Sequence, residues 1–253
     1  MSLVEPVPGQ PAAVAELDSS VGHRPERALV IADFHAGVES ALRADGVSLD
    51  SRAEERREQI FSLLDQTDPD RVVFLGDLMH AIGDPGGAER GEIEVLLERL
   101  DDRDVAVTLV KGNHDGAIES WADVEVTDGD GVRLGDVGFV HGHTWPAPEV
   151  LDSEVVCVGH EHPAVRLEDE VGGSRVERVW LRGDLDPEAF AGRSVGVRTG
   201  AELVVFPAFN ELVGSTWVNV EGQEFLAPFL PEAAPSAEAY LLDGTRLGDY
   251  QTV

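Results

Sequence analysis

Five apolar runs of the sequence each end directly before polar side chains that can bind metal ions. The potential ligands at these run ends are Asp33, His35, Asp77, Asn113, His141, His160 and His162. This set is too large for one tetrahedral ion and suits two ions that each keep an open position. Mixed oxygen and imidazole ligation without a thiolate favours Mn²⁺ and also suits Fe²⁺, Co²⁺ or Zn²⁺. Two divalent ions about 3.5–4 Å apart clamp a phosphate and activate a bridging water for attack.

The evidence for a metal site is that potential ligands recur at five run ends, and no single residue among them would be sufficient. A single histidine after a strand is more often a loop or core residue than a ligand. Parallel strands end at one edge of a sheet, and ligands bind in the crevice outside those ends. The glycines that precede Asp77, Asn113 and His160 allow the backbone to turn sharply there. We therefore expect the ligands from the five run ends to converge.

The first half of the chain alternates between strand and helix patterns. The expected elements are a strand at 28–32, a helix opening at 51, a strand at 72–75, a helix at about 89–100 and a strand at 105–110. The capping box Ser51-Arg52-Ala53-Glu54 marks the start of the first helix, and Asp68-Pro69-Asp70 ends it. Short apolar strands that alternate with helices are typical of a parallel sheet covered by helices.

The second half of the chain consists mainly of short β-rich runs. These lie at 138–140, 155–158, 176–181 and 203–206 and are joined by turns rich in Gly and Asp. They predict a second sheet that packs on the first within one domain. We expect a flexible N-terminal arm at 1–26 with a possible edge segment near 14–17, the main domain at 27–226, and a C-terminal extension at 227–253 packed on it. Residues 183–202 suggest a long loop, and the Pro- and Ala-rich residues 227–238 suggest a surface excursion.

The composition excludes several classes of protein. No apolar run approaches the ~18 residues that span a bilayer, and the N-terminus lacks a signal-peptide pattern. The single cysteine, Cys157, excludes an internal disulfide framework and fits a cytoplasmic protein without membrane contact. The formal net charge is −30, with 49 acidic against 19 basic residues. Such a charge either repels nucleic acid or reflects adaptation to molar salt, and the even spread of acidic residues favours the halophilic interpretation. The charge is therefore no guide to the substrate.

The sequence resembles the calcineurin-like metallophosphoesterase superfamily. The motifs that carry the resemblance are Asp33-Phe34-His35, Gly76-Asp77, Gly112-Asn113-His114-Asp115, His141-Gly142-His143 and Gly159-His160-Glu161-His162. The resemblance implies an α/β fold in which a two-sheet β-sandwich is flanked by helices. It also implies that Asp77 bridges two metal ions, one held by Asp33, His35 and His162 and the other by Asn113, His141 and His160. His114 would be the general acid, and Asp115 would orient it.

A closer likeness covers about residues 28–220. The segments Ile31-Ala32-Asp33-Phe34-His35-Ala36-Gly37-Val38-Glu39 and Phe206-Pro207-Ala208-Phe209-Asn210 resemble the SbcD-related archaeal phosphoesterases. Those enzymes are similar to small bacterial phosphoesterases found with DNA ligase or helicase partners. The likeness implies a phosphodiester substrate, with DNA or RNA as candidates and a helicase or ligase as a candidate partner.

Several alternatives stay open at this point. His143 could replace His141 as a ligand, although His141 is the residue that leaves the strand. His80 could face the substrate or solvent, and Arg178 and Arg182 could neutralise a phosphate or lie on the surface. Motifs of serine hydrolases, P-loop enzymes and the metallo-β-lactamase fold are absent from the sequence. The leading function is phosphodiester or nucleic acid hydrolysis. The alternatives are a phosphomonoesterase acting on nucleotides or other small phosphorylated molecules, and a weakly catalytic module that binds a partner.

Overall fold

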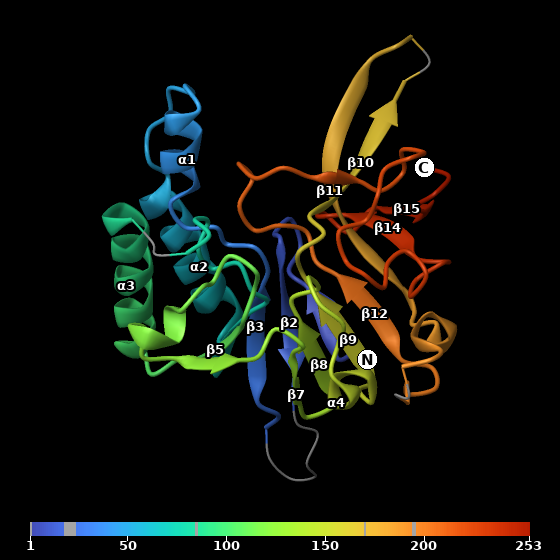
Figure 1. Ribbon diagram of the computed structural model, residues 1–253, viewed down its shortest axis with the longest axis horizontal. Coiled ribbons are helices and arrows are strands. Elements are labelled where there is room, and N and C mark those ends of the chain that lie inside the picture. The colour runs from blue at the N-terminus through green and yellow to red at the C-terminus, as the bar shows by residue number, and fades with distance from the viewer. Residues whose placement is uncertain (1, 18–23, 84–85, 170, 194–195) are drawn as a thin grey trace.

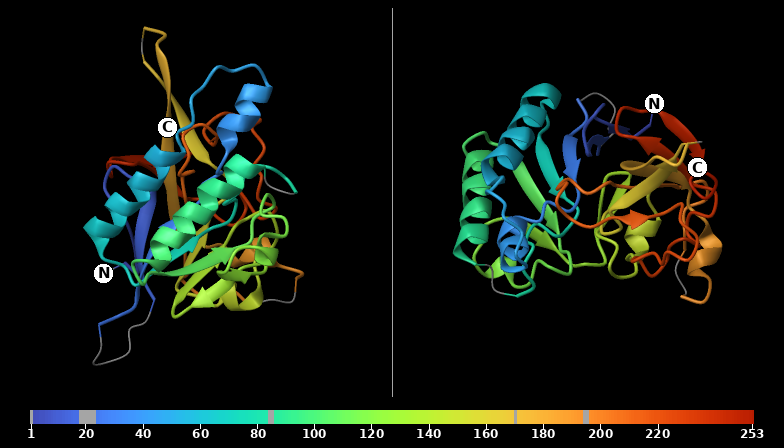
Figure 2. Two further views of the ribbon diagram at one scale, coloured as in Figure 1. Left: turned by 90° about the vertical axis from the view of Figure 1, so that its left-hand side faces the viewer. Right: turned by 90° about the horizontal axis from the view of Figure 1, so that it is seen from above.

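Two β-sheets pack face to face, and helices cover the outer face of the first sheet (Figures 1 and 2). The computed structural model describes residues 2–17, 24–83, 86–169, 171–193 and 196–253. The first sheet contains, in spatial order, β1 (Val4–Pro6), β2 (Ala12–Glu16), β3 (Arg27–Ile31), β4 (Arg71–Phe74), β5 (Ala106–Val110) and β6 (Glu125–Thr127). Strands β3 to β6 run parallel, as the strand–helix alternation predicts.

Three helices stand beside the first sheet (Figure 2, right). They are α1 (Val38–Ala44), α2 (Ala53–Thr67) and α3 (Gly87–Asp101). Ile60 of α2 and Ile93 of α3 are fully buried in one cluster with Leu29 of β3. The two predicted helices, one opening at 51 and one at about 89–100, are therefore confirmed as α2 and α3, whereas the sequence pattern does not predict α1.

The start of α2 differs in detail from the predicted capping box. The N-terminal cap is Arg52, and no side chain caps the helix. The backbone N–H of Arg52 instead donates to the Glu39 carboxylate over 2.7 Å. Ser51 Oγ accepts from the Ala53 N–H over 3.3 Å and not from the Glu54 N–H that a capping box requires.

The second sheet has nine strands. Its main path is β13 (Thr216–Trp217), β10 (Pro163–Glu168), β11 (Ser174–Asp184), β12 (Glu202–Val205), β9 (Val155–Val158), β8 (Val137–Val140) and β7 (Val132–Leu134). Strand β14 (Glu238–Leu241) pairs with β11 and with β15 (Arg246–Asp249). Short helical turns lie at η1 (Ile118–Ser120), α4 (Pro148–Leu151) and η2 (Pro187–Phe190).

The sandwich core lies between the two sheets. Val30 of β3 and Val204 of β12 are fully buried there in one cluster with Cys157 and Trp180. Leu29 and Ile31 point the other way, into the cluster under the helices. Because side chains alternate along a strand, β3 is apolar on both faces. The α/β fold class, a two-sheet sandwich flanked by helices, is confirmed.

The N-terminal residues are not a loose arm where the structure describes them. Strand β2 pairs antiparallel with β3 from Ala12↔Ile31 to Glu16↔Arg27, and β1 pairs with β2. Val4, Ala12, Ala13 and Ala15 have no solvent exposure. The possible edge segment expected near 14–17 is therefore part of β2, and ordered structure begins well before residue 27. Residues 18–23 of the expected arm lie outside the described part.

Two further expectations near the C-terminus are corrected. Residues 227–238 form part of the core, since Phe229 and Ala233 are buried against the second sheet. Strand β11 continues to Asp184 and the turn η2 follows, so 183–202 is only partly loop. The composition of 227–238 indicates a surface segment, but its alanines Ala233, Ala234 and Ala237 pack in the core. Across the described residues, no helix has the length and apolar character needed to cross a bilayer.

Candidate metal centre

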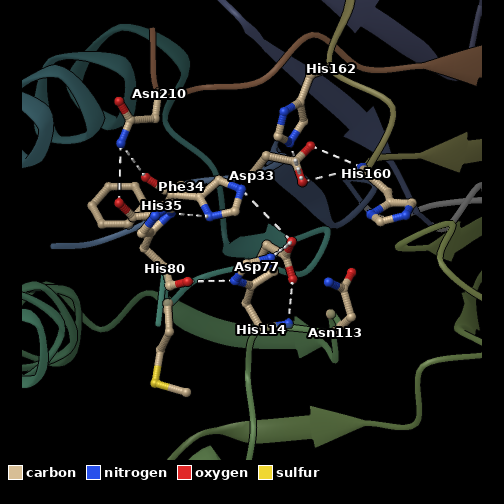
Figure 3. Close-up of polar contacts among 12 residues, drawn as sticks. Asp33, Phe34, His35, Asp77, His80, Asn113, His114, His160, His162 and Asn210 are labelled. Carbon is tan, nitrogen blue, oxygen red and sulfur yellow. Dashed lines mark hydrogen bonds and ion pairs between the residues drawn. The ribbon is translucent and has the colours of Figure 1, made fainter. Parts of the chain in front are cut away.

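The parallel strands of both sheets end at the same region, and their loops carry the expected ligands (Figure 3). Strands β3, β4 and β5 of the first sheet each lead into one loop, and β8 and β9 of the second sheet lead into two more. Groups of candidate ligands whose atoms all lie within 4.8 Å of one another are Asp33, His35 and His162; His35, Asp77 and His114; and Asp77, His141 and His160. The convergence predicted from the run ends is therefore present.

Asp77 lies at the centre of the arrangement. Its Oδ2 is 3.8 Å from His35 Nε2 and 3.4 Å from His141 Nε2. Asp77 therefore lies between the ligand group that contains His35 and the group that contains His141. His162 Nε2 lies 3.2 Å from Asp33 Oδ1 at one end. Asn113 Oδ1 lies 3.2 Å from His141 Nε2 at the other. One shared carboxylate between two ligand groups is the layout that a pair of ions needs.

The unpaired ring nitrogens show that these residues fit divalent cations. His35 Nε2 is buried and has no hydrogen-bond partner among the described residues, which is costly unless another group binds there. His162 Nε2 is also buried and faces the Asp33 carboxylate over 3.2 Å. The Nδ1–H of His141 donates to the Leu75 carbonyl over 2.7 Å, and that of His162 donates to the Gly214 carbonyl over 2.8 Å. Such bonds fix the ring and leave Nε2 as the ligand atom.

The electrostatics keep most of these groups in their ligating forms. Burial lowers the pKa of His35 and of His160 to about 4, so both rings are neutral at pH 7. Burial alone would raise the pKa of Asp77, but its hydrogen bond and attraction to His141 hold it well below the ordinary value. The same bond raises the pKa of His141 to about 9 against the opposing effect of burial. A cation would have to displace this proton.

The backbone is left-handed at most of these positions. Positive φ angles occur at Asp33 (56°), His35 (47°), Asp77 (48°), His160 (67°) and His162 (46°). Non-glycine residues seldom adopt such angles, and they cluster where function requires strain. The backbone of Gly112 also lies very close to Asp77. A Cβ atom at Gly112 would be only 2.2 Å from Asp77 Oδ1, so no larger residue fits there. The turns are therefore shaped to aim these side chains inward.

His114 lies at the edge of the centre with its ring held by the main chain. Its Nδ1–H donates to the His80 carbonyl, and its Nε2 lies 3.8 Å from Asp77 Oδ2. Its backbone N–H donates to Asp77 Oδ1 over 2.9 Å. Because Nδ1 is occupied by a carbonyl, Nε2 is the nitrogen that can exchange a proton with a bound molecule.

Asp115 does not orient the His114 ring, contrary to the expectation from the resemblance. In the described part of the chain, its carboxylate accepts hydrogen bonds from the backbone N–H groups of Gly112 (2.7 Å) and Met79 (3.1 Å). Burial and the charge of Asp77 raise the pKa of Asp115 to about 6. Asp115 thus fixes the turns that carry Asp77 and His114, and the His80 carbonyl orients the ring.

The other three candidates have different positions. The His80 ring lies against the centre, with Nδ1 3.3 Å from His35 Nδ1. His143 lies further out, its ring centroid 5.3 Å from that of His141, which is the residue within the ligand group. Arg182 is not at the centre: it pairs with Glu202 over 2.8 Å and donates to Ser2 and Val4. In so acidic a protein, a nearby carboxylate binds this arginine instead of a phosphate.

Two supporting residues were not assigned from the sequence. Asn210 is buried, and its Nδ2 donates to the Phe34 and His35 carbonyls over 3.0 and 3.1 Å. Glu89 of α3 is buried and accepts hydrogen bonds from the backbone N–H groups of His80 and Ala81. Asn210 belongs to the segment 206–210 that the resemblance singled out, but its contact could not be inferred. Nothing in the sequence separates Glu89 from the other acidic residues of its helix.

One family model and several solved structures are similar to this chain. The family model described as calcineurin-like phosphoesterase matches residues 26–182. The nuclease MPE of Pseudomonas putida shares the fold, with a TM-score of 0.57, 20% identity, and coverage of 96% of this chain and 100% of that one. The E. coli phosphoesterase YfcE is more distant, with a TM-score of 0.38, 16% identity, and coverage of 87% and 96%. No protein of curated function matches the sequence significantly. Because the family model covers more than half of the chain, the protein belongs to the calcineurin-like phosphoesterases and is a metal-dependent phosphoester hydrolase.

Proposed function

We propose that this protein is a two-metal-ion phosphodiesterase that cleaves the strands of nucleic acids. The observation that carries the proposal is the position of Asp77 between two groups of ligands, with His114 at their edge. A shared carboxylate allows two cations to act on one phosphate, and the nearby imidazole can serve the oxygen that leaves.

In this proposal, each of two ions has its own set of ligands, and one ligand is shared. Asp33, His35 and His162 hold one ion, Asn113, His141 and His160 hold the other, and Asp77 contributes to both. Divalent cations in these positions, Mn²⁺ first among them, supply positive charge to the phosphoryl oxygens and lower the pKa of the attacking water. The mixed carboxylate, amide and imidazole set supports Mn²⁺ over softer ions.

His114 acts as the general acid in this proposal. The His80 carbonyl keeps a proton on Nδ1, so the proton given to the leaving oxygen comes from Nε2. Glu89 holds the backbone of His80 and Ala81, which keeps the accepting carbonyl in place. Asp115 holds the turn from Gly112 to His114 through the Gly112 N–H. These contacts set the direction of the ring before substrate binds.

The test compares four substrates in molar potassium chloride with Mn²⁺: a bis-aryl phosphate, a mono-aryl phosphate, single-stranded DNA and RNA. We expect hydrolysis of the bis-aryl phosphate and of at least one nucleic acid. His114→Ala should lower kcat about 10²–10⁴-fold, because it removes the acid and leaves the ligands intact. Asp77→Asn should abolish activity and weaken Mn²⁺ binding, because it removes the shared negative charge.

Two results would contradict the proposal. Activity confined to the mono-aryl phosphate would identify a phosphomonoesterase instead. Inactivity with Mn²⁺, Fe²⁺, Co²⁺ and Zn²⁺, together with tight binding to a helicase or ligase, would identify a partner-binding module. Arg90→Gln is a suitable control, because Arg90 is exposed on α3, pairs with Glu94 and should leave all rates unchanged.

A further inference from the structure

A small pocket opens beside the candidate metal centre. It has a volume of about 270 Å³, and His162, Arg178, Asn210 and Ser215 are among the residues that line it. His162 belongs to one ligand group, and Asn210 supports the loop of His35, so the pocket adjoins the centre directly. Its volume falls below the range of pockets for drug-sized molecules and suits a single phosphate group.

Arg178 supplies the positive charge of this pocket. It lies on β11 opposite Ala164, two residues beyond His162 along β10. Its Nη1 donates to the carbonyls of Ala208 (2.8 Å) and Phe209 (3.3 Å), which fixes the guanidinium at the pocket wall. In the part of the chain that the structure describes, Nε and Nη2 have no hydrogen-bond partner, and the side chain has no ion pair. Two directed donors are therefore available to a molecule in the pocket.

Arg178 has no ion pair among the described residues, although the chain has 49 acidic and 19 basic residues. Arg182, four residues along the same strand, pairs with Glu202. Two carboxylates do line the pocket, but Glu211 pairs with Arg52, and Glu177 lies 3.5 Å from Arg175. Burial lowers the pKa of Arg178 although the charges of Glu211 and Glu177 oppose this shift, so the guanidinium is partly desolvated. A partly buried charge of this kind gains from an anionic ligand.

We propose that Arg178 binds the phosphate adjacent to the scissile one in a single-stranded polynucleotide. The inference rests on the proposed phosphodiesterase function and adds a subsite to it. A guanidinium fork suits phosphate because two parallel N–H groups meet two oxygens. Binding at this subsite would favour substrates with consecutive phosphates over simple esters that carry one phosphate. The protein would thus recognise the strand through its backbone, without reading bases.

The test uses two substrates that differ in the number of phosphates. Trithymidylate, d(TpTpT), has two phosphodiesters, and bis(p-nitrophenyl) phosphate has one. Arg178→Gln should raise KM for trithymidylate about tenfold more than KM for the aryl ester, which corresponds to the loss of one charge-assisted interaction. Arg178→Lys keeps the charge but loses the fork, so its effect should be intermediate. Arg166→Gln is the matched control: Arg166 is a half-buried arginine of β10 that pairs with Glu168, and its loss should alter neither KM.

Binding without turnover gives a second readout. In a His114→Ala background, Kd for a fluorescent oligothymidylate should weaken about tenfold when Arg178 is changed to Gln. Thermal unfolding of Arg178→Gln would show whether the loss of the hydrogen bonds to Ala208 and Phe209 disturbs the fold. If it does, Kd is compared between the wild-type residue and Arg178→Lys instead.

The outcomes separate the two proposals. If the wild type hydrolyses both esters and Arg178→Gln shifts both KM values equally or neither, the subsite is wrong and the phosphodiesterase stands. If the wild type hydrolyses no diester, the phosphodiesterase is wrong, and the binding measurement still decides the role of Arg178. Unchanged Kd in both Arg178 variants would overturn the subsite.

Discussion

At the residue scale, His141 and His162 differ from His35 and His160, because neighbouring carboxylates raise their pKa values against the effect of burial. Its contacts with Asp77 and Asp33 favour the protonated ring, and its pKa rises to about 9 despite complete burial. His35 and His160 have pKa values of about 4 and are neutral over the physiological range. His141 therefore holds a proton where a cation would bind, and Asp33 raises the pKa of His162 in the same direction.

This difference predicts that metal binding depends on pH with a known sign. Below about pH 9 the free protein holds a proton on His141, and binding of Mn²⁺ must release it. The apparent association constant should therefore rise about tenfold per pH unit between pH 6.5 and 8.5. His35 and His160 should add no slope, since they are already neutral there, whereas the raised pKa of His162 can only make the rise steeper. Calorimetric titration in two buffers of different ionisation enthalpy would count the proton; a constant affinity over this range would contradict the assignment.

At the element scale, a buried ion network joins the three helices beside the first sheet. Arg56 of α2 contacts Glu39 of α1 and Glu92 of α3, each over 2.8 Å, and all three residues are buried. Glu92 also accepts the N–H of Gly37, in the turn that follows His35, over 3.1 Å. The helices are thus linked to the loop that carries two of the ligands.

Removal of Arg56 should destabilise the protein strongly. Arg56→Met leaves two buried carboxylates without a partner, which costs about 3–5 kcal/mol of unfolding free energy. Arg56 now holds the pKa of Glu39 below its ordinary value despite burial. In the variant, burial would raise the folded-state pKa values above those of the unfolded chain. The folded state would then bind more protons, so the loss should shrink as pH falls toward 5.

Urea unfolding at pH 7 and pH 5 would measure this effect. Arg90→Met, which removes an exposed pair with Glu94, should cost less than about 1 kcal/mol at both values. An equal, small loss in the two variants would show that the buried network contributes little.

At the scale of the whole molecule, the net charge of −30 should make stability depend on salt. Repulsion among acidic groups opposes the compact state, and salt screens it as the Debye length falls from about 10 Å at 0.1 M to about 3 Å at 1 M. We expect the unfolding temperature to rise with potassium chloride, most steeply below about 0.5 M, where screening changes fastest. Differential scanning calorimetry across this range would test it, and a flat or falling unfolding temperature would contradict it.

The sequence predicted the site correctly where a potential ligand comes directly after a short apolar strand. Asp77 and His141 were located because each leaves a short apolar strand, and parallel strands end together. It was a poor guide where small residues pack closely: Ala13 and Ala233 are fully buried, yet both lie in segments whose prolines suggested loose chain. The contact of Asp115 with Met79 could not be foreseen, because it joins two loops through backbone groups. Arg182 failed as a candidate because its carboxylate partner comes from a neighbouring strand.

The left-handed backbone at Asp33, His35, Asp77, His160 and His162 has a consequence for how the centre handles its ions. Each residue in this conformation costs on the order of 1–3 kcal/mol, which the packing around it must offset. If the packing of the two sheets alone holds these turns, exchange of a bound ion would need no refolding. The ion carried at any moment would follow the supply in the surroundings, and a change of growth medium would change the metal recovered with the protein.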